Sequence, residues 1–291
     1  MILSDFILPS RVNQYYEFSG IDSPEHCLDS QHFENYPHPI TYQYNSRGFR
    51  DSEWPESTQE LQQAIWCIGD SFTVGIGSPL THTWPFMLQQ QAHTRTINVS
   101  LDGASNTWIA RKVSAVARAI VPKTIVVHWT YIHRREQDSA AILDRKYSEF
   151  YNNVRDPLWP DSVKLKDFDQ LPPHIQQELI ELHGMNHVLT VTDEERRISS
   201  VTDGHAQDMQ NLLDCIQSVA ELDCNIIHSF IPGFKPRILE CEQFYSQLGQ
   251  VQHIPEFPIL DYARDCYHYD ISTAQQFVRY IGAQLMLQGT V

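Results

Sequence analysis

Short segments that are predicted to be strands alternate along the chain with longer segments whose apolar residues recur at helical spacing. The clearest strand is the apolar run at residues 64–68, and further strands are predicted at residues 96–100, 124–129 and 225–231. Short apolar runs bounded by turn residues are typical of strands buried within a parallel sheet. A short fifth strand is predicted near residues 253–260.

The segments between these strands favour amphipathic helices. One apolar helix face is built by four residues spaced by four, three and four positions, namely Ile109, Val113, Val116 and Ile120. Another helix is predicted to begin at Thr83 as its cap, a third covers residues 209–219, and the last begins with the capping-box pattern Thr273-x-x-Gln276. This alternation predicts an α/β fold with a doubly wound, mainly parallel five-stranded sheet in the order 2-1-3-4-5.

The domain organisation follows from where the periodic pattern stops. Residues 1–60 are rich in Pro, Tyr, Ser and Asn without a sustained period, which predicts an irregular N-terminal arm on a domain that covers residues 61–291. Residues 135–205 are too long for a structureless loop in a compact domain, so a helical insertion is expected there. Such an insertion either roofs the active site, mediates self-association as a homo-oligomer, or is a solvated decoration.

Charge and hydropathy argue against nucleic acid as a partner and against a membrane span. The chain has 291 residues and a formal net charge of -15, which argues against nucleic acid as a partner because phosphate binding needs clustered Lys and Arg. No run of 18 or more apolar residues occurs, so no membrane span is expected. The first six residues lack the basic start and apolar core of a secretory signal, which predicts a cytoplasmic protein or an export product without its signal.

Cysteine and histidine spacing gives no sign of a metal site or cofactor. The six cysteines show no C-x-x-C spacing and suit reduced thiols in a cytosolic protein. His183 and His187 have helical i, i+4 spacing, but Gly184 interrupts them and no third ligand is evident. We therefore expect neither a metal nor a cofactor.

The candidate chemistry begins at Gly69-Asp70-Ser71, directly after the first predicted strand. The carboxyl edge of an open parallel sheet is where such folds bind ligands, and this turn presents a hydroxyl there. A serine hydroxyl is a weak nucleophile at neutral pH and requires a general base. Asp265-x-x-His268, shortly before the last predicted helix, offers one.

Together these residues resemble the SGNH (GDSL-type) hydrolase family of esterases and related acyl-group enzymes. The resemblance covers residues 45–134 and 205–288, and it includes the upstream segment at residues 45–50, Asn-Ser-Arg-Gly-Phe-Arg. It implies a flavodoxin-like three-layer α/β/α sandwich with Ser71 as nucleophile and Asp265 and His268 as the other triad members. It also implies that the backbone N–H groups of Ser71 and Gly103 bind the oxyanion.

One block departs from the family pattern. The third motif, Gly-x-Asn-Asp, should follow the strand at residues 124–129, yet the chain continues with Thr130-Tyr131-Ile132 and has no Asn there. The Asn amide normally donates to the oxyanion, and loss of such a donor costs about 2.7 to 4 kcal/mol of transition-state stabilisation. Thr130 through its hydroxyl, or Asn106 from the neighbouring loop, could replace that donor.

Alternatives remain open at the level of the sequence. Gly-Asp-Ser is also a common turn, and Ser105 is a rival nucleophile, although it lies where Ser usually caps a helix. The function indicated is a serine esterase that hydrolyses a small-molecule or glycan ester, O-acetyl or short acyl. A carbohydrate O-acetyltransferase or a non-catalytic binding module on the same scaffold are the alternatives. Sugar stacking would use the aromatic residues Tyr15, Tyr16, Trp84 and Trp159.

Overall fold

The fold is taken from a computed structural model of the chain. It describes residues 6–8, 11–19, 22–24, 36, 38–132, 134, 208–232, 248, 253–254 and 257–287. The chain divides into two compact units, one formed by residues 1–131 together with 215–291 and the other by residues 132–214. The expected insertion at residues 135–205 lies outside the described residues and stays a prediction.

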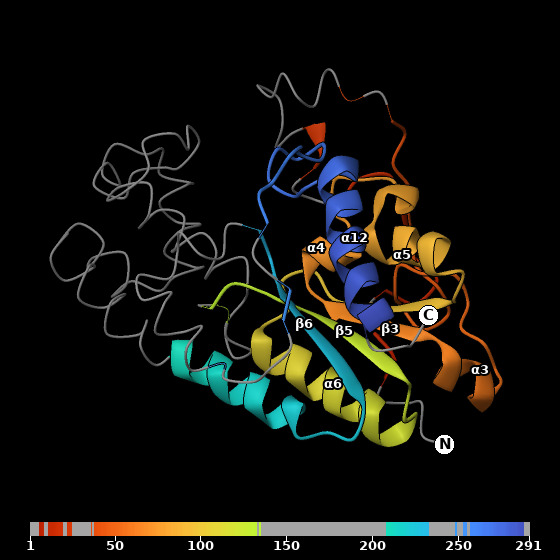
Figure 1. Ribbon diagram of the computed structural model, residues 1–291. Helices are drawn as coiled ribbons and strands as arrows, with labels where there is room; N and C mark the ends of the chain where they lie inside the picture. Colours follow the sequence, from red (N-terminus) through yellow and green to blue (C-terminus); the bar gives the residue numbers. More distant parts are fainter. Residues whose placement is uncertain are drawn as a thin grey trace, which may run out of the picture. The chain divides into compact units, whose positions relative to one another are not determined.

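A four-stranded parallel sheet forms the centre of the first unit (Figure 1). Its strands are β3 (Ile65–Gly69), β4 (Thr96–Ser100), β5 (Thr124–Trp129) and β6 (Asn225–Phe230), in the order β4-β3-β5-β6. All residues of β3, β4 and β5 are buried, as their sequences predicted. The sequence therefore predicted these four strands and their order 2-1-3-4 correctly. The strand order reverses at β3, because β4 lies on one side of it and β5 on the other.

The predicted fifth strand is represented by one isolated bridge. His228 of β6 pairs with His253 in the parallel direction, and the N–H of Ile254 donates to the His228 carbonyl over 2.7 Å. Residues 251–252 and 255–256 lie outside the described residues. The five-stranded order thus stays a prediction.

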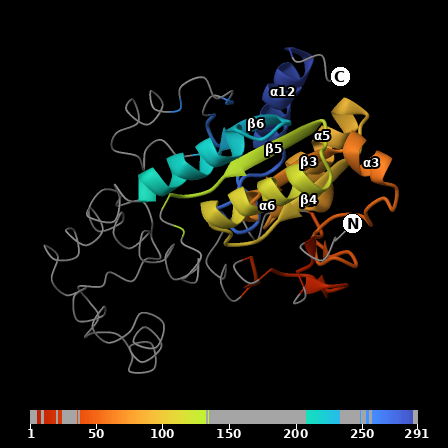
Figure 2. The ribbon, with the colours of Figure 1, turned by 90° about the horizontal axis from the view of Figure 1, so that it is seen from below.

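Helices cover both faces of the sheet (Figure 2). On one face α5 (Trp84–Ala92) packs against α12 (Ile271–Leu287), and on the other α6 (Asn106–Ala119) lies against β3 and β5. The buried rings of Trp84 and Phe277 meet edge to face at 5.1 Å between centroids, which joins α5 to α12. Trp84 is therefore a core residue, and the predicted role of its ring in sugar stacking is wrong.

Shorter elements complete the first unit. They are the β1 (Tyr15–Tyr16) and β2 (Tyr42–Gln43) pair, α3 (Thr58–Gln63), α4 (Ser71–Val74) and the 3₁₀ turn η3 (Leu80–His82). A helix over residues 208–220 leads into β6, close to the predicted range. Within the described part of the chain, no helix has both the length and the apolar character that crossing a membrane requires.

Capping residues explain where two of these helices begin. Ser105 is the N-cap of α6 and accepts the N–H of Trp108, as its cap-forming residue type indicated. The predicted capping box of the last helix is wrong, because α12 already begins at Ile271 and Thr273 lies within its first turn. The N–H groups of Ser272 and Thr273 instead donate to the carboxylate of Asp261, over 2.7 and 2.9 Å.

Candidate active site

Ser71 lies at the turn between β3 and α4, at the carboxyl edge of the sheet. Asp70 caps α4, since its side chain accepts the N–H of Phe72 over 3.1 Å, and Ser71 is the first helical residue. The turn requires glycine at position 69, because a Cβ there would come within 2.1 Å of the Thr73 hydroxyl and 3.0 Å of the His128 carbonyl. The local sequence thus presents the Ser71 hydroxyl at the sheet edge.

His268 and Asp265 approach Ser71 from the segment before α12. The distance from His268 Nε2 to Ser71 Oγ is 2.8 Å, and that from His268 Nδ1 to Asp265 Oδ2 is 2.5 Å. The other Asp265 oxygen accepts the N–H groups of Tyr267 and His268, which orients the carboxylate. Residues 197 positions apart along the chain thus form one hydrogen-bonded row of hydroxyl, imidazole and carboxylate.

Burial and charge act in opposite directions on His268. The imidazole is buried, which by itself lowers its pKa, but the charge and hydrogen bond of Asp265, together with the charges of Asp102 and Asp70, outweigh burial, so the pKa lies above the ordinary histidine value of 6.5. The carboxylate therefore stabilises the imidazolium form of His268. This is the form that arises when His268 takes a proton from Ser71.

The raised pKa of His268 predicts the acid limb of the pH profile. Only neutral imidazole can accept the Ser71 proton, so ester turnover should fall as pH decreases, with a midpoint above 6.5. The pH dependence of kcat/KM for an uncharged ester measures this midpoint for the free protein. A midpoint well below that of an ordinary histidine would contradict the assignment of His268 as base.

Two backbone N–H groups that follow the carboxyl ends of β3 and β4 are candidates for an oxyanion site. They belong to Ser71 and to Gly103, which follows β4 and has φ +72. Within the described part of the chain, neither N–H donates to an acceptor of the protein. Both are therefore available to an oxygen bound at the sheet edge.

The side chains of Asn106 and Thr130 are both occupied within the protein. The Asn106 amide donates to the carbonyls of Thr130 and Tyr131, each over 3.2 Å, and its oxygen accepts the Thr130 N–H. The Thr130 hydroxyl donates to Asp70 Oδ2 over 2.5 Å. In this arrangement both side chains brace the end of β5, and a role for either as oxyanion donor stays a prediction.

Asp70 is a site residue whose role the sequence did not predict. Its carboxylate is fully buried, caps α4 through one oxygen and accepts the Thr130 hydroxyl through the other. It therefore ties the first turn of α4 to the residue that follows β5. The sequence contains one indication of this hydrogen bond. Thr130 stands where the family pattern has another residue, and a hydroxyl can donate to a buried carboxylate.

The loop that follows α4 packs against the segment that carries Asp265. Gly77 has φ +77, and a Cβ there would lie 2.8 Å from the Ala263 Cβ and 3.0 Å from Asp265 Oδ1. Gly77 also accepts the Arg264 N–H at its carbonyl over 2.9 Å. The position of the Asp265 carboxylate thus depends on a residue without a side chain at 77.

Gly77→Ala should both destabilise the protein and lower its activity. The left-handed backbone costs about 1 to 2 kcal/mol for alanine, and the added methyl group displaces Asp265 or Ala263. Denaturant unfolding and ester turnover measure the two effects. Gly282→Ala in α12 is the matched control, because its Cβ would meet only the flexible end of Gln91, so it should leave turnover unchanged. Unchanged turnover in Gly77→Ala would contradict the account of this contact.

The remaining candidate ligands of the sequence are those for a metal ion and for a sugar. Among the described residues, no group of three or more His, Cys, Asp or Glu side chains lies close enough to hold a metal ion. His183, His187 and Trp159 lie outside those residues. Tyr15 is 60% exposed, on the surface of β1.

Comparisons with known proteins give similarities of structure only. No family model matches the sequence, and no curated protein matches it. "Crystal Structure of TesA" is 13% identical, with a TM-score of 0.42, over 76% of this chain and 97% of that chain. A lipolytic G-D-S-L family protein from Veillonella parvula is 12% identical (TM-score 0.40; 76% of this chain, 97% of that one). A family two carbohydrate esterase from Clostridium thermocellum, in complex with cellohexaose, is 12% identical (TM-score 0.39; 78% and 65%). The solved structures to which this chain is similar thus include a member of the lipolytic G-D-S-L family, the family that the sequence blocks resemble.

Proposed function

We propose that the protein is a serine esterase of the SGNH type, with Ser71 as nucleophile, His268 as general base and Asp265 as the residue that orients the imidazole. Its substrate is a carboxylic ester, O-acetyl or short acyl, on a small molecule or a glycan. The proposed scaffold is the flavodoxin-like five-stranded order 2-1-3-4-5, with residues near His253 on the fifth strand. No metal or cofactor takes part in the proposed reaction.

The observation that supports this proposal most is the row of two short contacts, 2.8 Å from Ser71 to His268 and 2.5 Å from His268 to Asp265. Both ring nitrogens of the imidazole are used, one by the hydroxyl and one by the carboxylate. Hydrogen-bond distance between nucleophile and base, with the base oriented by a third group, is the arrangement that activates a serine.

In the acylation step, Ser71 Oγ attacks the ester carbonyl carbon while its proton passes to His268 Nε2. The carbonyl oxygen becomes an oxyanion and accepts the N–H groups of Ser71 and Gly103. Collapse of this intermediate breaks the bond to the alcohol, which leaves with the proton that His268 returns. The product is an acyl group esterified to Ser71.

In the deacylation step, water gives a proton to His268 and attacks the acyl carbonyl, and the same N–H groups bind the second oxyanion. The acid then leaves and Ser71 regains its proton from His268. An alcohol in place of water would give acyl transfer, which is how the O-acetyltransferase alternative would use the same residues.

A panel of p-nitrophenyl esters of increasing acyl length tests the proposal. We expect release of p-nitrophenol that is fastest for acetyl or other short chains. A glycerol or sugar alcohol added as acceptor separates the two enzymatic functions, because a transferase releases acylated alcohol in place of free acid. Absence of turnover for every ester by the folded protein would favour a non-catalytic binding module.

A further inference from the structure

We propose that Arg50 is a positioning residue for the triad, whose buried guanidinium fixes the end of α4 and the following loop and so sets the distance between Ser71 and His268. The inference rests on the proposed function, because it concerns the same nucleophile and base. Arg50 lies in the segment at residues 45–50, which resembles the family but for whose residues no role was predicted.

Arg50 is a buried cation that binds main-chain carbonyls. The residue is 1% exposed, and its guanidinium lies 4.2 Å from the centre of the Tyr42 ring. Nη1 donates to the carbonyls of Val74 and Gly75 over 3.1 and 2.5 Å. Nη2 donates to those of Thr41 and Ser78 over 3.1 and 2.8 Å. Burying an arginine is costly, and four carbonyls that converge on one guanidinium offset that cost.

Two of these carbonyls, those of Val74 and its C-cap Gly75, lie at the end of the helix that Ser71 begins, and that of Ser78 lies in the loop after it. α4 comprises only residues 71–74, and Gly75 is its left-handed C-cap, with φ +77. The last carbonyls of a helix have no partner within it, and they carry the negative end of its dipole. Because α4 is a single turn, whatever fixes its last carbonyls also fixes the position of Ser71 at its first residue.

The loop that Arg50 holds also contacts the segment that carries the base. The Ser78 hydroxyl donates to Asp270 Oδ1 over 2.9 Å, two residues beyond His268. The Gly77 carbonyl accepts the N–H of Arg264, next to Asp265. Arg50 thus lies at the junction between the element with the nucleophile and the segment with the base and acid.

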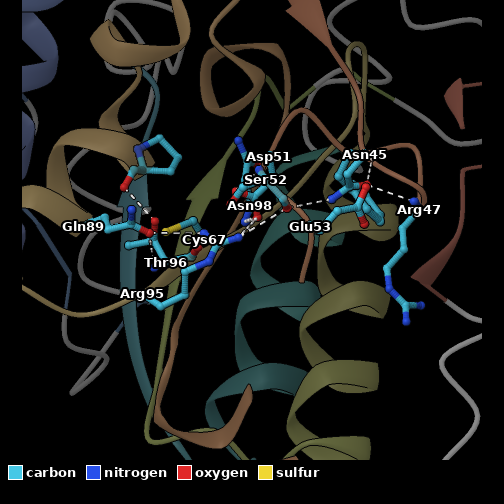
Figure 3. Close-up of polar contacts among 12 residues, drawn as sticks. Asn45, Arg47, Asp51, Ser52, Glu53, Cys67, Gln89, Arg95, Thr96 and Asn98 are labelled. Atoms are coloured by element: carbon cyan, nitrogen blue, oxygen red, sulfur yellow. Dashed lines mark hydrogen bonds and ion pairs between the residues drawn. The ribbon is translucent and has the colours of Figure 1, made fainter. Parts of the chain in front are cut away.

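The segment around Arg50 is itself fixed on both sides (Figure 3). Before it, the Asn45 side-chain oxygen accepts the N–H groups of Arg47 and Phe49 over 3.0 and 3.1 Å. After it, Asp51 Oδ2 accepts the Asn98 N–H of β4 over 3.1 Å and pairs with Arg95 over 3.0 Å. Arg50 therefore extends from a held backbone, so its guanidinium can act as a rigid support for α4.

The test compares Arg50→Lys and Arg50→Met with the wild type by the rate at which a fluorophosphonate labels Ser71. A lysine ammonium is a single point charge and cannot bind four carbonyls in the plane of a guanidinium, so we expect labelling to slow. A misplacement of about 1 Å can cost about a hundredfold in rate, and we expect a loss of that order in Arg50→Met with a smaller loss in Arg50→Lys. The loss should fall on the maximal labelling rate and leave the half-saturating probe concentration unchanged.

Arg11→Lys is the matched control. Like Arg50, Arg11 holds its guanidinium over tyrosine rings, 5.6 Å from the centre of Tyr16 and 5.2 Å from that of Tyr44, and Nη1 donates to the Tyr44 hydroxyl over 3.4 Å. These contacts do not involve α4 or the loop after it, so Arg11→Lys should leave the labelling rate of Ser71 unchanged. Equal labelling rates in the Arg50 variants and the wild type, or an equal slowing in Arg11→Lys, would overturn the proposal.

Ser78→Ala keeps the proposal testable if the Arg50 variants do not fold. It removes the hydroxyl that joins the loop to Asp270 but leaves the Ser78 carbonyl for Arg50. We expect labelling to slow by about threefold to tenfold, because the loop then holds the base segment less firmly. An unchanged rate in this variant would overturn the proposed coupling.

Failure of this inference is distinguishable from failure of the proposed function. If the wild type is not labelled at Ser71, the esterase proposal fails, and crystal structures then test Arg50 by geometry alone. In Arg50→Met the distance from Ser71 Oγ to His268 Nε2 should lengthen from 2.8 Å to beyond about 3.5 Å. An unchanged distance would show that Arg50 does not position the two residues.

Discussion

Ser71→Ala is expected to abolish ester turnover while leaving the fold intact. The hydroxyl is the atom that would form the acyl-enzyme, and removing a serine nucleophile from such a triad typically costs about 10⁶-fold in kcat. Ser71 is buried at the first position of α4, where alanine is a good helix former and the loss of one oxygen leaves the Asp70 cap in place. Turnover of p-nitrophenyl acetate, compared at equal concentrations of folded protein, measures the effect.

Ser105→Ala serves as the control for Ser71→Ala. Ser105 is the rival nucleophile of the sequence, and its hydroxyl accepts the Trp108 N–H at the start of α6. Loss of this cap should cost about 0.5 to 2 kcal/mol of stability and little activity. If Ser71→Ala kept wild-type turnover while Ser105→Ala lost it, the nucleophile would be misassigned.

Asp265→Asn is expected to lower kcat by about 10⁴-fold, because an amide can donate to His268 Nδ1 and so stabilise the wrong tautomer. The charge of Asp265 also raises the pKa of His268 against burial, so its removal should move the acid limb of the pH profile to lower pH. The two readouts are independent, since one is a maximal rate and the other a midpoint. Both come from one series of rates measured against pH.

Asp223→Asn is the matched control for the charge change. Asp223 is an exposed carboxylate in the turn before β6 and should affect neither kcat nor the midpoint. A midpoint in Asp265→Asn equal to that of the wild type would show that Asp265 does not set the pKa of His268. The proposed role of the carboxylate would then have to be abandoned.

Local sequence patterns predicted the strands of the sheet and the N-cap of α6, because these features depend on residues that are close together in the sequence. The apolar runs at residues 64–68 and 124–129 correspond to β3 and β5, because burial on both faces favours an apolar residue at most positions, and β6 lies within the predicted range 225–231. Ser105 caps α6 because its hydroxyl reaches an N–H three residues away. The fifth strand, the N-terminal arm and the insertion stay predictions.

Interactions between distant parts of the chain could not be predicted in the same way. Asp261 accepts the first N–H groups of α12 from a loop, so the local capping pattern at Thr273 gave the wrong start. Thr130 and Asn106 were predicted as oxyanion donors only because their side chains can donate a hydrogen bond. The residue type does not show which acceptor lies within reach of the side chain in the folded protein. In the structure the Thr130 hydroxyl donates to Asp70, and the Asn106 amide donates to the carbonyls of Thr130 and Tyr131, which follow β5.

The burial of Arg50 could not be predicted from the sequence either. An arginine in a loop is ordinarily exposed, and only the folded chain brings four carbonyls around it. The need for glycine at positions 75 and 77 also follows from the fold, because the atoms that a side chain would meet there belong to Thr83 and Ala263. The chemical groups of the site could thus be proposed from motifs, whereas the residues that hold them required the structure.

The most direct test of the central claim is peptide mass spectrometry of the folded protein after reaction with a fluorophosphonate. We expect one adduct, on the peptide that contains Ser71, and no adduct in His268→Ala. An adduct on Ser105 in place of Ser71, or no adduct on the folded wild type, would contradict the assignment of Ser71 as nucleophile.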